Sequence, residues 1–385
     1  MVSLWPMALS IALFYAAIFL YIGVQLPFWP VWLTAHGVTA AEIGVLLSVA
    51  AWIRAFAPPL IAQFADRTGR PKRLIVVLLA ATICSYALFA LVDGFWPLLA
   101  VSALAALAFG AILPLSENLA MRASHEHDFD YGRVRLWGSL TFIVGATFGG
   151  RLLVGREADF VLTMMLAALG LALLASLALP RSTTAKSKSA RPPIADLLSR
   201  PVFIVFLLAA GLTQASHAAY YGFATLHWRA AGISNDVIGA LWAEGVIAEV
   251  ALFAFSGAIA RKLGPTRLLA LGVVAGLIRW SALGLTTELW ALVAVQGLHA
   301  LTFAATHLAA MHFLLRAVPA SYSSTAQGLY SGLGTGALMG LAMIVSGALY
   351  GAFGGVAFMS MAALSLAGGV AAIALARMWR GGEIM

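Results

Sequence analysis

Twelve long apolar runs follow one another along this 385-residue chain, and they constrain its fold more than any other feature. Each run is close to the length of about twenty residues that a helix needs to cross a bilayer core. With 62% hydrophobic and 10% charged residues, the chain has more apolar surface than a soluble domain can bury. We therefore predict an all-α membrane protein with twelve transmembrane helices. The runs cover residues 8–32, 41–65, 74–92, 97–121, 134–154, 160–179, 201–226, 237–260, 268–286, 289–315, 326–350 and 354–376.

The basic residues indicate how the chain is oriented. Eighteen of the 23 Lys and Arg residues fall in alternate loops and in the C-terminal tail. By the positive-inside rule, both termini are expected in the cytoplasm. The net charge of +8 therefore marks topology and does not predict nucleic-acid binding. The N-terminus lacks a basic leader region, so we interpret it as a retained first helix. We expect a multi-pass monomer in a bacterial-type inner (plasma) membrane.

The segment 180–200 interrupts the apolar pattern. It is rich in Pro, Ser, Thr and Lys, which is typical of a linker. We predict a cytoplasmic linker here, between two six-helix halves at 1–179 and 201–385. The single cysteine, Cys84, excludes an internal disulfide and argues against a thiolate metal site.

The two predicted halves resemble each other in sequence. Arg54 stands fifteen residues before Gly69, and Glu249 stands fifteen residues before Gly264. Repeats related by an axis along the membrane normal are typical of the major facilitator architecture. Such an axis would place Arg54 and Glu249 on facing surfaces of a central cavity. Arg54 lies twelve residues before Asp66, roughly 18 Å along a helix, which predicts a cation near mid-membrane.

The loop "FADRTGRPKR" resembles the signature between the second and third helices of the major facilitator superfamily, with Ala62 where that family usually has Gly. We predict that its charged residues form a latch that closes the cytoplasmic side. The alternative is that the charges only set orientation. The expected gate residues are Asp66, Arg67, Gly69 and Arg70.

Ionisable side chains inside the predicted spans are the main candidates for function, because burying them in lipid costs about 2.5–3.5 kcal/mol each. Glu117 and Arg135 lie on adjacent helices and can pair across a cavity, although Arg135 can also extend to the interface. Glu249 is the best candidate for a group that takes up a proton. The full set is Arg54, Glu117, Arg135, His217, Glu244, Glu249, Arg279, His299, His307 and His312.

Histidines and tyrosines add further candidates. His299 and His307 are eight residues apart, about 80° around a helix, and are expected to face the cavity. His217 is followed by Tyr220 and Tyr221, and aromatic rings with a few polar tips suit a planar, partly charged ligand. Helix packing is the alternative for these aromatic residues. The histidine spacings do not match a metal pair at i and i+4, so we predict no metal and no cofactor.

Several segments resemble the 3-phenylpropionate transporter family of the major facilitator superfamily. They are "PFWPVWL", "DYGRVRLWGS", "SHAAYYGF", "GVIAEV", "LIRWSA" and "LHALTFAATHLAAM". The resemblance implies proton-coupled uptake of a small aromatic carboxylate. The substrate carboxylate is expected on Arg135 or Arg54, and the ring near Tyr220 and Tyr221.

The chain is also distantly similar to the lactose permease family of sugar–proton symporters. Glu117 and Arg135 match the spacing of that family's sugar-contacting pair. Arg279 and His299 match its helix-9 arginine and helix-10 histidine. Thr302 stands where that family has its proton-carrying glutamate. We therefore expect Glu249 to carry the proton instead, with Arg279 beside it and His299 or His307 as relay.

These features predict a proton symporter that imports a small organic anion by alternating access. Two alternatives within transport are a proton symporter for a sugar or nucleoside and an exporter of a drug or metabolite. An intramembrane enzyme is not expected, because the sequence shows no nucleophile motif, no HExxH and no Gly-rich phosphate loop. A sensor without transport activity would need a signalling domain, and the tail "RMWRGGEIM" has none.

Overall fold

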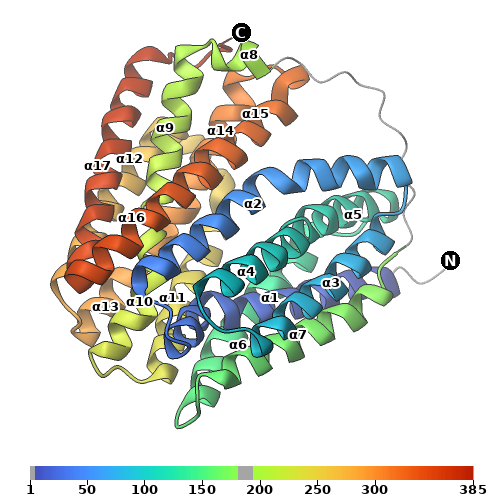
Figure 1. The fold of residues 1–385 in the computed structure, drawn as a ribbon. Coiled ribbons are helices and arrows are strands. Elements are labelled where there is room, and N and C mark those ends of the chain that lie inside the picture. Colours follow the sequence, from blue (N-terminus) through green and yellow to red (C-terminus); the bar gives the residue numbers. More distant parts are fainter. Residues whose placement is uncertain (1–4, 181–193, 385) are drawn as a thin grey trace. The chain divides into compact units, whose positions relative to one another are not determined.

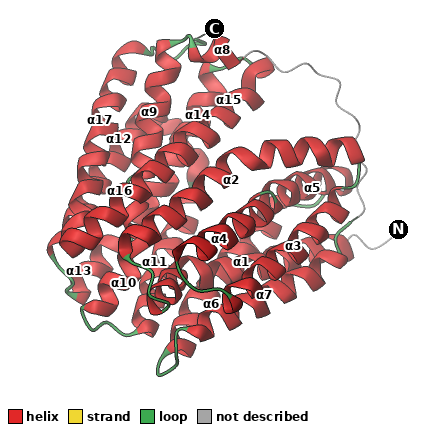
Figure 2. Ribbon diagram, in the orientation of Figure 1, coloured by secondary structure: helices red, strands yellow, loops and turns green. Residues whose placement is uncertain are grey.

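The computed structural model describes residues 5–180 and 194–384 of the chain. Within these ranges the chain forms helices joined by turns, without a β-strand (Figure 2). The all-α prediction is therefore confirmed. Most of the predicted linker, residues 181–193, lies outside the described residues.

The helices of the described ranges are long and apolar enough to cross a membrane. Eleven segments meet that criterion, and the last, Ala320–Met378, contains two long helices that a short turn at Gly354–Val356 separates. Counting these two apart gives twelve segments, as the apolar runs predict. Many large apolar side chains face outward, including Trp96 and Trp290, each 73% exposed. Outward-facing apolar side chains are what a protein surrounded by lipid requires.

The described chain divides into two compact units. Unit 1 comprises residues 1–42, 56–188 and 232–243, and unit 2 comprises residues 43–55, 189–231 and 244–385. Residues 43–55 of helix α2 (Ala40–Thr68) belong to unit 2, and its other residues belong to unit 1. Helix α11 (Asn235–Ala254) is also shared between the units. The predicted division into two six-helix halves stays a prediction.

In unit 1, α1 packs along α6 and α7, and α3 packs against α4, α5 and α7 (Figure 1). Close helix contact between α1 and α6 depends on glycine. A Cβ on Gly23 would strike the backbone of Phe142, and a Cβ on Gly145 would lie 2.6 Å from the carbonyl oxygen of Leu20. Small residues at such crossings let two membrane helices approach closely. The helices are α1 (Trp5–Ala35), α3 (Pro71–Leu88) with the 3-10 turn η1 (Phe89–Leu91), α4 (Phe95–Gly110), α5 (Ile112–His127), α6 (Tyr131–Leu153) and α7 (Asp159–Leu177).

In unit 2, α12 packs against α14 and α17, and α9 packs against α17. Their buried side chains form one core, which includes Phe206, Phe313 and Leu375. The helices are α8 (Ile194–Leu198), α9 (Pro201–Ala215), α10 (Ala218–Ala230), α12 (Ser256–Leu285), α13 (Leu289–Gln296), α14 (Thr306–Ala317), α15 (Ser323–Leu329), α16 (Leu338–Phe353) and α17 (Ala357–Met378), with short helices η2 (Ala300–Ala305), η3 (Ala320–Tyr322), η4 (Tyr330–Ala337) and η5 (Gly354–Val356).

Several of the apolar runs in unit 2 are not regular α-helices, and two of them hold the histidine candidates. The run 201–226 is divided at Ser216 and His217, where α9 ends and α10 begins. The run 289–315 contains the π-helix η2 between α13 and α14. π-Helical segments in α-helices often lie at functional sites. The candidate His217 lies at the first irregularity, and the candidate His299 directly precedes the second.

The turns that follow α2 and interrupt α12 share a backbone feature. Gly69 ends α2 with φ 63°, and its N–H donates to the carbonyl oxygen of Ala65. Gly264 has φ 70° inside α12, directly before Pro265, and divides that helix by a kink. The left-handed conformation favours glycine, and proline is well tolerated at the first turn of a following helix. The repeat in the sequence therefore has a counterpart in the backbone.

Candidate functional site

Glu117 and Arg135 approach each other in unit 1. Arg135 Nε lies 3.8 Å from Glu117 Oε1, and the two side chains are 30% and 44% exposed. The guanidinium carbon of Arg135 lies 4.1 Å from the ring centre of Phe19 and 5.6 Å from that of Tyr15. Tyr131 of α6 is close enough to interact electrostatically with Glu117 and Arg135. We call Tyr15, Phe19, Glu117, Tyr131 and Arg135 the Arg135 cluster.

The guanidinium of Arg135 is held in place by rings and by one loose ion pair. Among the described side chains, none accepts a hydrogen bond from this guanidinium. The 3.8 Å between Arg135 Nε and Glu117 Oε1 is too long for a hydrogen bond. Gly138, one turn further along α6, makes room for it. A Cβ on Gly138 would lie 2.8 Å from Arg135 Nη1 and 2.8 Å from the Phe19 ring. The N–H groups of Arg135 therefore remain available to a ligand.

The remaining cations expected to act on the substrate or the gate are exposed. Arg54 is exposed and belongs to unit 2. Arg67 and Arg70 are exposed at the end of α2, and Gly69 between them is the helix cap. The Asp66 side chain lies outside the described residues, so the predicted latch stays a prediction.

Arg279 is the centre of a buried polar network in unit 2. It is 0% exposed, and it lies 4.4 Å from the ring centre of Tyr220 and 4.8 Å from that of Trp280. Its Nη2 donates to Gln296 Oε1 at 2.7 Å, and Gln296 Nε2 donates to the Tyr220 hydroxyl at 3.0 Å. A buried cation needs such partners, since burial without them is costly. Arg279 is thus held inside the protein, whereas Arg135 is accessible.

The contacts of His299 determine which of its nitrogens carries the proton. Arg279 Nη1 lies 2.9 Å from His299 Nδ1. A guanidinium can only donate, so Nδ1 accepts and the proton of the neutral ring is on Nε2. His299 Nε2 lies 3.7 Å from Glu249 Oε2, and the Glu249 side chain is 22% exposed. His299 therefore directs an N–H toward a partly exposed carboxylate in α11.

Thr302 joins Arg279 to His217. Its Oγ1 accepts from Arg279 Nη1 at 3.2 Å and lies 3.1 Å from His217 Nε2. His217 Nδ1 lies 3.0 Å from the carbonyl oxygen of Gln214, which can only accept, so Nδ1 carries the proton. The Thr302 hydroxyl then donates to His217 Nε2. The carbonyl oxygen of His299, at 3.3 Å, is a longer alternative acceptor for the same proton. We call Arg279, His217, Tyr220, Gln296, His299 and Thr302 the Arg279 network.

The other predicted aromatic and histidine candidates differ in their contacts. Tyr220 is 2% exposed and its hydroxyl is bound in the Arg279 network, whereas Tyr221 is partly exposed. His307 lies in α14 with its ring 6.5 Å from that of Tyr330, and no described polar side chain binds it. Among the described residues, no group of three or more His, Cys, Asp or Glu residues is arranged to hold a metal ion.

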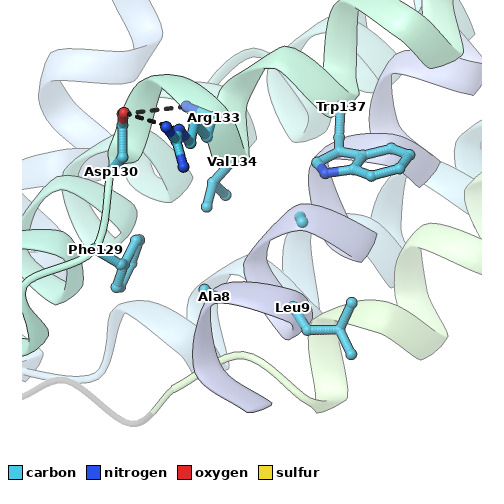
Figure 3. Close-up of a pocket in the computed structure, with 8 residues that line it drawn as sticks. Ala8, Leu9, Phe129, Asp130, Arg133, Val134 and Trp137 are labelled. Atoms are coloured by element: carbon cyan, nitrogen blue, oxygen red, sulfur yellow. Dashed lines mark hydrogen bonds and ion pairs between the residues drawn. The ribbon is translucent and has the colours of Figure 1, made fainter. Parts of the chain in front are cut away.

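One apolar cavity of about 380 Å³ opens between the first turns of α1 and α6 (Figure 3). Arg133 on its rim is directed toward Asp130, with which it forms an ion pair at 3.5 Å (Figure 3). None of the candidate site residues lines this cavity. The lining residues are Ala8, Leu9, Ala12, Phe129, Asp130, Arg133, Val134 and Trp137.

Five residues at these sites were not predicted from the sequence, namely Tyr15, Phe19, Tyr131, Gly138 and Gln296. One signal was present, because Gln296, His299 and Thr302 recur every three residues and therefore lie close together on one helix. No such spacing connects Tyr15 and Phe19 to Arg135, since they come from α1 and α6.

The helical fold and its buried ionisable groups define a class of protein, a multi-pass membrane transporter of the major facilitator superfamily. A solved structure of a point mutant of the nucleoside transporter NupG has the same fold, with a TM-score of 0.86. It shares 17% sequence identity and is matched over 97% of this chain and 100% of that chain.

The sequence comparisons give the family. Residues 7–361 match the MFS_1 like family, to which this chain belongs. The chain is 34% identical over 365 residues to a probable 3-phenylpropionic acid transporter of Escherichia coli (strain K12), covering 92% of this chain and 94% of that protein. It is 25% identical over 138 residues to the lactose permease of Citrobacter freundii, about 33% of each chain. Both predicted resemblances are therefore confirmed.

Proposed function

We propose that this transporter imports a small aromatic carboxylate, such as 3-phenylpropionate, together with protons. Import would proceed by alternating access across a bacterial-type inner membrane. One observation carries the proposal. Arg135 is a cation in a membrane helix, 30% exposed, with aromatic rings beside it and no short bond from a described side chain. The likeness to a probable 3-phenylpropionic acid transporter supports the same class of substrate.

Arg135 would bind the substrate carboxylate. A guanidinium offers parallel N–H groups that match a carboxylate in a bidentate pair. Tyr15 and Phe19 provide aromatic surface beside that cation, and the substrate's ring would pack against such surface. Arg279 does not suit this role, because it is 0% exposed and its Nη1 and Nη2 atoms already donate to His299, Thr302 and Gln296.

Glu249 would carry the proton that drives uptake. Its carboxylate is 22% exposed and lies 3.7 Å from His299 Nε2, whose ring is fixed by Arg279 on the other side. A carboxylate at the edge of a buried network can exchange a proton with water and still interact with the network. Because His299 Nδ1 accepts a hydrogen bond from Arg279, only Nε2 of the ring is left to interact with Glu249.

Equilibrium binding with purified protein tests the substrate class. Labelled 3-phenylpropionate should bind wild type and be displaced by other aryl carboxylates. The uncharged 3-phenylpropionamide should not compete, because it lacks the charge that Arg135 recognises. Equal competition by the amide would contradict a carboxylate site.

Glu249→Gln tests the coupling. The variant should exchange labelled for unlabelled substrate across proteoliposome membranes at a rate near that of wild type. It should accumulate less substrate than wild type under an inward proton gradient, because the amide at position 249 cannot carry a proton. Glu288→Gln, an exposed carboxylate elsewhere in unit 2, is the matched control and should accumulate normally. Loss of exchange as well would assign Glu249 to substrate binding.

A proton symporter for a sugar is the second candidate. The Glu117–Arg135 pair presents an acceptor and a donor 3.8 Å apart, which can bind neighbouring hydroxyl groups. The lactose permease similarity supports it over part of the chain. Displacement of bound 3-phenylpropionate by disaccharides, or sugar uptake without aryl-acid uptake, would favour this alternative.

A further inference from the structure

The Arg135 cluster has a charge balance that a carboxylate substrate would upset. Arg135 contributes one positive charge and Glu117 one negative charge, and they lie 3.8 Å apart. The pair is neutral overall, as an ionisable site inside a membrane protein generally must be. The separation is too long for a hydrogen bond, so a ligand can bind the guanidinium without breaking a short contact.

A substrate carboxylate on Arg135 would lie close to Glu117. Two carboxylates that share one guanidinium lie within roughly 6 Å of each other, and like charges at that distance disfavour ionisation of both. The bound site would then hold two negative charges against one positive charge. Neutrality returns if one carboxylate is protonated.

Within the described part of unit 1, no second positive charge is found beside Glu117. Among the described side chains, Arg135 is the one cation that acts on Glu117. The other titratable groups facing it are the hydroxyls of Tyr131 from α6 and Tyr15 from α1.

The two other helices that pack on α5 also supply no neutralising charge. Helix α4 has no charged residue in its sequence. Lys72 of α3 is bound to carbonyl oxygens of Leu177 and Leu179, and Arg73 beside it is exposed at the first turn. A proton is therefore the simplest way to restore neutrality.

We propose that Glu117 takes up one proton when a substrate carboxylate binds to Arg135. This inference rests on the proposed carboxylate substrate. The proton comes from water and bonds to a Glu117 carboxylate oxygen, no covalent bond of the substrate changes, and the site has zero net charge both empty and loaded. The new O–H of Glu117 can donate to the substrate carboxylate or to a neighbouring tyrosine oxygen. Substrate binding and proton binding are thereby linked inside unit 1, separately from Glu249.

Proton uptake on binding tests this assignment directly. Purified full-length protein in weakly buffered detergent solution is mixed with 3-phenylpropionate near neutral pH, and a pH indicator reports protons taken up. Wild type should take up about one proton per substrate bound. Its Kd should then rise about tenfold per pH unit over the range where Glu117 is ionised before binding and protonated in the complex.

Glu117→Gln should bind substrate with almost no proton uptake and with a Kd that does not change with pH. Glu117→Asp keeps a carboxylate and should restore uptake, which separates a lost proton site from a folding defect. Glu126→Gln removes an exposed carboxylate from the same helix and should behave as wild type. Glu249→Gln should keep binding-linked proton uptake.

Three results would overturn the inference. If wild type binds 3-phenylpropionate without proton uptake, Glu117 stays ionised in the complex. If proton uptake is retained in Glu117→Gln and lost in Glu249→Gln, the proton linked to binding belongs to Glu249 in unit 2. Absence of 3-phenylpropionate binding by wild type at any pH would instead reject the proposed substrate, and with it the premise of this linkage.

Discussion

Replacing Thr302 with Val should destabilise the protein more than its small size suggests. Thr302 is 0% exposed, and its hydroxyl accepts from Arg279 at 3.2 Å and bonds His217 at 3.1 Å. A hydrogen bond to a charged group contributes about 1.5–3 kcal/mol and a neutral one about 0.5–1.5 kcal/mol. Valine has nearly the same shape, so no cavity adds to the loss. We expect Thr302→Val to lower the free energy of unfolding by about 2–4.5 kcal/mol.

Thr306 provides a matched control four residues further along. It is also 0% exposed, but its hydroxyl has no hydrogen-bond partner among the described residues. Removing a buried hydroxyl without a partner loses no bond, so Thr306→Val should stay within about 1 kcal/mol of wild type. Thr302→Ser keeps the hydroxyl and should lose only about 1 kcal/mol, for one buried methyl group.

Unfolding by sodium dodecyl sulfate in mixed micelles, followed by tryptophan fluorescence, gives the comparison. Thr302→Val should unfold at a clearly lower detergent fraction than Thr306→Val. Equal midpoints for the two valine variants would refute the assigned hydrogen bonds of Thr302. A Thr302→Ser variant as unstable as Thr302→Val would show that the methyl group matters and the hydroxyl does not.

Three further variants test the two clusters. Arg135→Ala should weaken 3-phenylpropionate binding at least tenfold, from the loss of about 1.5–3 kcal/mol in a charge-assisted bond, and Arg135→Lys should fall between it and wild type by equilibrium binding. Gly138→Ala should reduce affinity without abolishing folding, measured by the same titration alongside a melting curve, because the added Cβ would displace the Arg135 guanidinium from Phe19. His299→Gln keeps an acceptor for Arg279 and a donor for Glu249, so its proton-driven uptake in proteoliposomes should exceed that of His299→Ala; equal uptake would contradict the assigned proton position on His299.

The sequence was sufficient for the helices and for part of each cluster. Apolar runs of membrane-spanning length leave few alternatives to helices, because lipid cannot satisfy an open backbone. Glu117 and Arg135 were expected to pair, and they lie 3.8 Å apart. Arg279, His299 and Glu249 were expected to act together. Arg279 Nη1 lies 2.9 Å from His299 Nδ1, and His299 Nε2 lies 3.7 Å from Glu249 Oε2.

The features that escaped prediction depend on contacts between helices. The break between α9 and α10 falls at Ser216 and His217, where no Gly or Pro stands to interrupt a helix. Gly138 is one of 37 glycines, and only the positions of Phe19 and Arg135 distinguish it. Composition likewise could not tell the accessible Arg135 from the buried Arg279, because the exposure of each guanidinium depends on the helices packed around it.

Uptake of labelled 3-phenylpropionate into proteoliposomes tests the proposed transport most directly. The outside is acidified to impose an inward proton gradient, and a protonophore is then added. The proposed function predicts accumulation above the external concentration, which the protonophore abolishes. Accumulation that persists after the gradient is collapsed would contradict proton coupling, and absence of uptake in both conditions would contradict the substrate.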